Sequence, residues 1–235
     1  MNNEFIEKND YFGLADGTML VCSSSEDGRS NEVASATGQD GAIVAHNVYG
    51  EKIAPSNEYV MKAVTFSKGE GELAIGQIHK LEDTHTSICL GSLSIGTSAG
   101  SAPTISASGE QVEDDSSDNC VFKIPAFSLT KKHHAQILFN AFTFSGTGIH
   151  LKSASYDITA SITKGEKEGK CLTHDVVEGK IECSVEFLSV SGNKPTLTPG
   201  EGWDVTSVPS SSNPNADWPT WSATLTKYLT KESEG

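Results

Sequence analysis

The sequence lacks a long hydrophobic run. No stretch approaches the roughly 18 consecutive apolar residues that identify a membrane-spanning helix, and the first ten residues, Met1 to Asp10, lack the basic segment followed by an apolar one that marks a signal peptide. We therefore expect a protein that is made and kept in the cytoplasm until it joins an assembly, and that has no membrane partner.

Basic residues are also scarce. The chain holds 17 Lys and Arg against 31 Asp and Glu, which gives a formal net charge of −14 at pH 7. Nucleic-acid-binding surfaces need clustered Lys and Arg to replace the counterions of the phosphates, so this composition argues against such a surface. The acidity fits a soluble surface, or a passage that must not hold a polyanion.

Cysteine usage indicates free thiols. The five cysteines are an odd number and lie in or beside apolar, strand-like runs, at Cys22, Cys89, Cys120, Cys171 and Cys183. We therefore expect buried thiols without disulfides. Cys171, His174 and Cys183 approach a metal-ligand pattern, but a fourth partner is missing and the spacing matches no zinc motif, so we expect no metal and no cofactor.

Sequence motifs for catalysis are absent. The chain has no Gly-rich phosphate loop, nucleophile elbow, zincin helix or dinucleotide fingerprint, and its seven histidines are scattered. We do not expect an enzyme, although a site assembled by the fold from distant carboxylates stays open. His133 and His134 are expected to be solvated. The acidic stretch Gly109 to Asn119 lacks EF-hand spacing and is expected to be a solvated loop rather than a calcium site.

The clearest structural pattern lies between Ile149 and Val190. Here apolar residues alternate with polar ones, at Ala154, Tyr156, Ile158, Ala160 and Ile162. Alternation with period two predicts a strand with one buried and one solvated face.

Two further strands are expected to complete an antiparallel meander. The charged run Lys164 to Lys170 predicts a solvent-exposed connection to a strand over Cys171 to Val177. Glu178-Gly179 then predicts a tight turn into a third strand over Lys180 to Val190.

The rest of the N-terminal part also favours strands. Asn31 to Thr37 and Ala42 to Tyr49 flank Gly38 to Gly41, which predicts a hairpin. Residues up to Asp16 are expected to form an arm whose large apolar residues dock onto a neighbouring surface, namely Phe5, Ile6, Tyr11, Phe12 and Leu14. The predicted fold class is all-β, mainly an antiparallel sandwich or barrel.

One helix is expected near residues 130–142. Thr130 is a suitable N-cap, and apolar residues follow at helical spacing, at Ala135, Leu138, Phe139 and Phe142. The alternation of Ile137, Phe139 and Ala141 keeps a strand possible.

The C-terminal part differs in composition. We expect residues 1–190 to form the main β domain with its N-terminal arm, and the Pro/Ser/Trp-rich segment 191–235 to pack on that domain or on a neighbouring subunit. The tryptophans Trp203, Trp218 and Trp221 all lie in this segment. They are expected to lock it onto a core or partner, with a sugar-stacking platform as the alternative.

Taken together, these features resemble the structural proteins of tailed-phage virions, most of all the tail tube (major tail) proteins. The resemblance rests on the acidic β-rich chain, the hairpin around Gly38 to Gly41, the expected helix at Thr130 to Phe142, the meander from Ile149 to Val190 and the sequence segment Asp217 to Tyr228. It is a similarity of pattern over most of the chain, without a diagnostic motif.

The resemblance implies a structural virion protein made in the host cytoplasm. Such a protein self-assembles into rings, often hexameric or pseudo-hexameric, that stack into a tube and join other phage tail proteins. DNA would pass as a non-specific passenger through an acidic lumen. Two alternatives remain open: a monomeric β-sandwich binding module of the carbohydrate-binding or adhesin kind, or another virion role such as tail terminator, baseplate or head decoration.

Overall fold

The computed structural model describes residues 10–37, 43–81, 86–112, 121–167, 170–211, 213 and 217–231. This part of the chain contains strands and no helix, which confirms the predicted all-β class. The strands are β1 (Leu20–Glu26), β2 (Ser30–Thr37), β3 (Ile43–Lys52), β4 (Ser56–Met61), β5 (Thr65–Lys68), β6 (Ala74–Ile75), β7 (Ile78–Leu81), β8 (Thr86–Ser98), β9 (Thr104–Val112), β10 (Phe122–Lys123), β11 (Phe127–Thr130), β12 (Phe142–Ser145), β13 (Ile149–Lys167), β14 (Lys170–Ser189), β15 (Thr196–Pro199), β16 (Asp204–Ser210) and β17 (Thr220–Tyr228).

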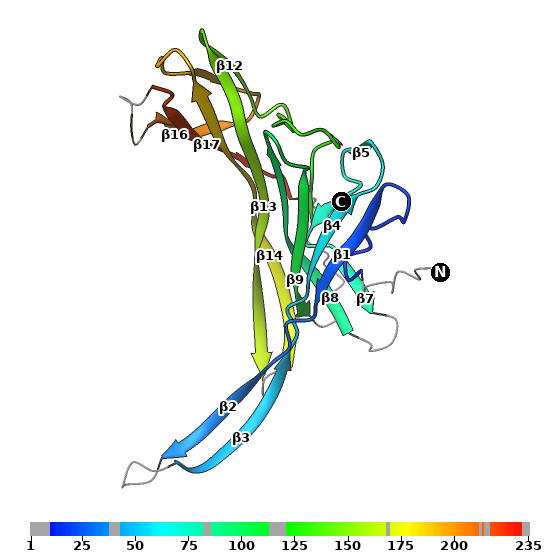
Figure 1. Cartoon of the computed structure of the whole chain (residues 1–235). Coiled ribbons are helices and arrows are strands. Elements are labelled where there is room, and N and C mark those ends of the chain that lie inside the picture. Colours follow the sequence, from blue (N-terminus) through cyan, green and yellow to red (C-terminus); the bar gives the residue numbers. More distant parts are fainter. Residues whose placement is uncertain are drawn as a thin grey trace, which may run out of the picture.

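One large sheet organises the molecule. Its strands follow the order β1-β4-β9-β8-β13-β14-β17-β16, with β7 added beside β8, and each pairing is antiparallel. The central strands β13 and β14 hold 19 and 20 residues and run much of the length of the molecule (Figure 1). The C-terminal strands β16 and β17 therefore belong to the same sheet as β1 and β4.

The alternation that predicted β13 is confirmed, because Ala154, Tyr156 and Ile158 are all buried in the core. The predicted turn at Glu178-Gly179 is wrong. These two residues lie inside the continuous strand β14, where the pairing register with β13 shifts between Thr159 and Ser161. Glu178 adopts a φ of 58°, so the one extra residue of β14 is absorbed as a bulge and the chain does not reverse.

The predicted hairpin around residues 38–41 is present as β2 and β3, although that turn itself lies outside the described residues. The two strands continue the β1–β4 pair and project past the large sheet as a curved arm (Figure 1). The arm therefore extends the molecule well beyond its core.

The main core lies on one face of the large sheet, and a second, small cluster forms around Cys89, Val112, Phe122 and Val176. Three short two-stranded sheets, β5–β11, β6–β10 and β12–β15, contribute apolar side chains to this core. Aromatic contacts connect the layers: the ring centroids of Phe127 and Phe139 are 5.3 Å apart, and those of Phe139 and Tyr156 are 5.5 Å apart. The fold is thus a sandwich of one large sheet and several small ones.

The predicted helix over residues 130–142 is not present. β11 ends at Thr130, the following residues are irregular, and β12 begins at Phe142. Phe139 and Asn140 have φ values of 56° and 49°, which an α-helix does not allow. The Gln136 side chain bonds instead to the backbone of Thr130, so a side chain replaces helical hydrogen bonds.

Candidate functional site: the polar face of the sheet

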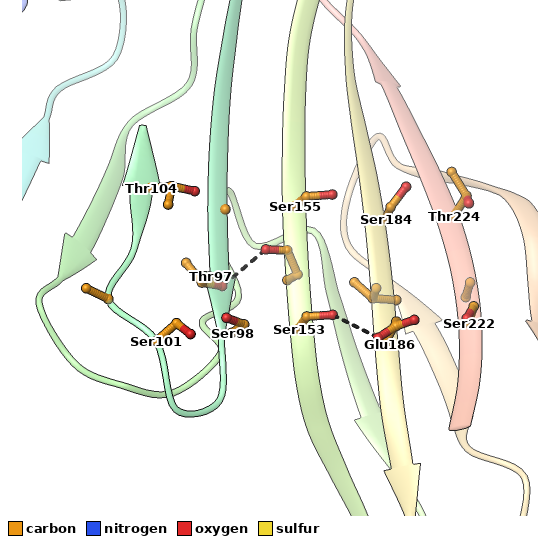
Figure 2. A pocket seen from close by; sticks show the side chains of 15 residues that line it. Thr97, Ser98, Ser101, Thr104, Ser153, Ser155, Ser184, Glu186, Ser222 and Thr224 are labelled. Carbon is orange, nitrogen blue, oxygen red and sulfur yellow. Dashed lines mark hydrogen bonds between the residues drawn. The ribbon is translucent and has the colours of Figure 1, made fainter. Parts of the chain in front are cut away.

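The face of the large sheet opposite the core carries mostly hydroxyl side chains. Strand pairing aligns one row across five strands, consisting of Thr104, Gly96, Ser155, Ser184 and Thr224. The neighbouring row consists of Ser98, Ser153, Glu186 and Ser222. Figure 2 shows these side chains along β8, β13, β14 and β17, where they line a shallow groove of about 640 Å³.

The groove offers hydrogen-bonding groups but little reactive chemistry. Its lining contains no histidine, cysteine or lysine, and Glu186 is its one acidic residue. The Glu186 carboxylate accepts a hydrogen bond from the Ser153 hydroxyl at 3.3 Å and forms an ion pair with the Lys152 ammonium at 3.1 Å. No imidazole is therefore available within this lining to activate a serine as a nucleophile.

A third row on the same face is acidic. Pairing aligns Glu58, Ser106, Ser94, Asp157, Glu182, Thr226 and Asp204. Asp157 and Glu182 lie directly opposite each other on β13 and β14, so two like charges face the solvent side by side. Asp157 accepts a hydrogen bond from the Ser94 hydroxyl at 2.6 Å. The Lys180 Nζ lies 3.5 Å from the Glu182 Oε2 and forms an ion pair with it.

The two edges of the sheet run in opposite directions. The path from β1 to β16 holds eight strands that alternate in direction, so β1 and β16 are antiparallel to each other. Within the described part of the chain, β1 pairs only with β4 and β16 only with β17. The outer edge of β1 is capped at its start, where Leu20 accepts a hydrogen bond from Gly17 at 3.2 Å.

The structure separates the histidine and cysteine considered for a metal site. His174 and Cys183 are nine residues apart on the continuous strand β14, which corresponds to about 30 Å. Cys183 faces Tyr156 in the core, whereas His174 pairs with Lys164 near the far end of the strand. Among the described residues no group of three metal-ligating side chains comes together.

The other predicted polar residues remain separate. His133 and His134 are exposed, as expected. Glu110, the first acid of the predicted loop, is instead in β9 and forms an ion pair with Lys164 at 2.7 Å. The remaining acids of that stretch lie outside the described residues.

The expectation of buried thiols without disulfides is confirmed for Cys89 and Cys183, whereas Cys22 is only partly buried. Burial raises the pKa of both Cys89 and Cys183 to about 12. These two thiols are therefore unreactive core residues. Cys120 and the side chain of Cys171 lie outside the described part of the structure.

The tryptophans divide into two groups. Trp203 is buried and Trp221 is packed partly buried against the same core, so both side chains attach the C-terminal segment to it. Trp218 is 66% exposed, so it alone presents an open indole face. A platform for sugar stacking would have to use Trp218.

Sequence reasoning identified the alternating strands but missed all three rows. Alternation shows that Ser155 and Asp157 share one face of β13. It does not show that Ser184 and Glu182 lie beside them, because that depends on the register with β14. The bulges that set this register have no signal in the hydrophobic pattern.

No protein-family model matches this chain, and no curated protein shows a significant sequence match to it. Among the described residues no helix is long and apolar enough to cross a membrane.

Proposed function

We propose that this chain is the subunit of a phage tail tube, a structural virion protein whose rings stack around a channel for DNA. The observation that carries the proposal is the polar face of the large sheet, which is lined by hydroxyls and by the acids Glu58, Asp157, Glu182 and Asp204. A surface of this kind is well hydrated and repels phosphate, so DNA slides along it without binding.

The two faces of the sheet favour one orientation in a ring. The core face carries the three small sheets, and the opposite face carries short polar side chains. Placing the polar face inward leaves the bulkier layers on the outside, where there is more room. The groove and the acidic row then line the bore.

The sheet edges support a head-to-tail ring. Because β1 and β16 run in opposite directions, a neighbouring copy rotated about an axis along the strands would place its β1 antiparallel to β16. Such a contact joins two different edges, which is the heterologous arrangement that generates rings. Closure also removes the unpaired strand edges that otherwise favour aggregation.

The projecting hairpin provides a contact along the tube. A two-stranded hairpin on its own is marginally stable in water. The arm formed by β2 and β3 extends past the large sheet (Figure 1). In a stacked assembly this arm would reach the adjacent ring and be stabilised there.

Negative-stain electron microscopy of the purified protein, with its mass in solution, tests the proposal. We expect hollow rings or tubes with a mass that is a multiple of 24.9 kDa. Single rings that never stack would favour a tail terminator, baseplate or head-decoration role. A monomer at high concentration would exclude the tube.

Exposed Trp218 favours the monomeric carbohydrate-binding module as the second candidate. Trp218 lies just before β17 and offers one open ring face. In that case glycans would quench tryptophan fluorescence in the native protein and leave the Trp218→Ala variant unchanged. Quenching on self-association instead would assign Trp218 to a subunit contact.

A further inference from the structure

The segment Asp10 to Asp16, called here the N-terminal strap, is held on the sheet by side chains. Tyr11, Phe12 and Leu14 are buried in the main core. Among the described residues, no backbone-to-backbone hydrogen bond joins the strap to a strand. Its docking therefore depends on a few side-chain contacts, and the loss of one of them can free the whole segment.

Asp10 is the principal polar anchor. Its carboxylate accepts hydrogen bonds from the Tyr59 hydroxyl at 2.7 Å, the Ala15 N–H at 2.7 Å and the Phe12 N–H at 3.3 Å. The Tyr11 N–H donates to the side-chain oxygen of the buried Asn57 at 3.2 Å. Burial, followed by the contact with Asp10, raises the pKa of Tyr59, so its hydroxyl remains a donor.

His79 of β7 lies beneath this strap. Its ring contacts the Phe12 ring edge-on, with centroids 6.0 Å apart and planes at 87°. A Cβ at Gly13 would lie 3.9 Å from its Nδ1, so the strap backbone also lies over the imidazole. Its Nε2 is buried and has no hydrogen-bond partner among the described residues.

The surroundings of His79 disfavour its charged form. Burial holds the pKa of His79 below its ordinary value, and the carboxylate of Asp10 opposes this shift more weakly. On the sheet side, β8 places the apolar Ile88 opposite His79. A proton on Nε2 would thus place a charge between the mostly apolar surfaces of the strap and the sheet, where the described residues offer Nε2 no hydrogen-bond acceptor.

We propose that the N-terminal strap is an acid-released latch in which protonation of His79 undocks residues 10–16 from the sheet. His79 therefore binds a proton more tightly when the strap is released than when the strap is docked over it. Docking is therefore complete above about pH 6.5, the ordinary value for histidine, and weakens as the pH falls below it. Release exposes the apolar site of Phe12 and frees the N-terminal segment to contact another molecule.

Amide hydrogen exchange of the full chain between pH 8 and pH 5 tests this proposal. Protection of the Tyr11, Phe12 and Ala15 amides, corrected for intrinsic exchange, should fall below about pH 6.5 by at most tenfold per pH unit, the limit for one proton. Both His79→Phe and His79→Gln should keep this protection constant over the same range. The exposed His133→Gln serves as the matched control and should behave like the wild type.

Two results would overturn the latch. One is a strap that stays fully protected at pH 5 in the wild type. The other is a loss of protection in His79→Phe and His79→Gln with the same midpoint as in the wild type, which would assign the acid response to another group. Neither result depends on whether the protein forms tubes.

Discussion

The Phe122 ring lies directly against Gly179, where a Cβ would come within 2.3 Å of the ring. This contact joins β10 to the bulge in β14, next to the positive φ of Glu178. The Gly179 carbonyl also accepts a hydrogen bond from Leu229 at 2.8 Å. Gly179 is thus the point where the C-terminal segment and β10 both contact the β13–β14 pair.

Gly179→Ala should destabilise the fold by about 1–3 kcal/mol, because the new methyl group has no space beside Phe122. Urea unfolding would measure the loss as a lower transition midpoint. Gly69→Ala is the matched control, since its Cβ meets only the flexible side chain of Glu72 at 3.2 Å. Equal midpoints for the two variants would show that the bulge tolerates a side chain.

Gln136 stabilises the loop that replaces the predicted helix. Its side-chain oxygen accepts from the Thr130 N–H at 2.9 Å and its nitrogen donates to the Thr130 carbonyl at 2.8 Å. Gln136→Ala removes the side-chain acceptor of the partly buried Thr130 N–H, whereas the Thr130 carbonyl keeps the Lys132 N–H at 2.8 Å. The loss should cost about 1–3 kcal/mol in the free energy of unfolding. As a control, substitution of the exposed Lys132 by Ala should change the free energy of unfolding by less than about 0.5 kcal/mol. An equally small effect of Gln136→Ala would show that Gln136 does not stabilise this loop.

The comparison of Gln136 with Tyr156 explains which parts of the fold were predictable. Tyr156 lies in a strand whose alternation is a local property, and the sequence pattern therefore identified its burial correctly. The helix-like spacing of Leu138 and Phe139 was also local, but tertiary contacts override it. The Tyr156 hydroxyl accepts a hydrogen bond from the Leu138 N–H at 2.9 Å, which helps to hold the backbone in a non-helical conformation.

The candidate site was less accessible to sequence reasoning than the core. Its rows join residues from distant parts of the chain, such as Glu58 and Asp204. The net charge of −14 indicated an acidic surface but not which strands share it. Only the register between strands places Asp157 directly opposite Glu182.

Cysteine reactivity should separate the core thiols from the others. At pH 8, Cys89 and Cys183, each with a pKa of about 12, should be alkylated about a thousandfold more slowly in the native protein than after unfolding. Peptide mapping after iodoacetamide treatment measures this for each residue. Rapid native labelling of Cys183 would contradict its burial beside Tyr156.

Neutralising one acid of the opposed pair should slightly stabilise the subunit. Asp157→Asn removes a like charge facing Glu182 and keeps an acceptor for the Ser94 hydroxyl. We expect a gain of about 0.3 kcal/mol at low ionic strength that disappears in high salt. Asp204→Asn is the control, because Asp204 lies opposite Thr226 rather than an acid; equal gains in both variants would point to relief of the overall net charge.

Charge reversal on the polar face tests whether that face lines a bore. The triple variant Glu58→Lys, Asp157→Lys and Asp204→Lys should still assemble, because none of these side chains contributes to the core. If the protein forms the proposed tubes, those of this variant should retain short duplex DNA at low salt and release it as salt rises, since lysines replace phosphate counterions. Co-sedimentation of tubes with labelled DNA measures this retention, and in a phage carrying the variant the same contacts should slow DNA passage.

The matched control reverses the same number of exposed acids elsewhere, at Glu70, Glu72 and Glu201. If the polar face is the lumen, DNA held by the first variant is enclosed and protected from added nuclease, whereas DNA held by the control lies outside and is digested. Protection depends on enclosure and not on net charge, which changes equally in both variants. Equal digestion in the two variants would place the polar face on the outside of the assembly.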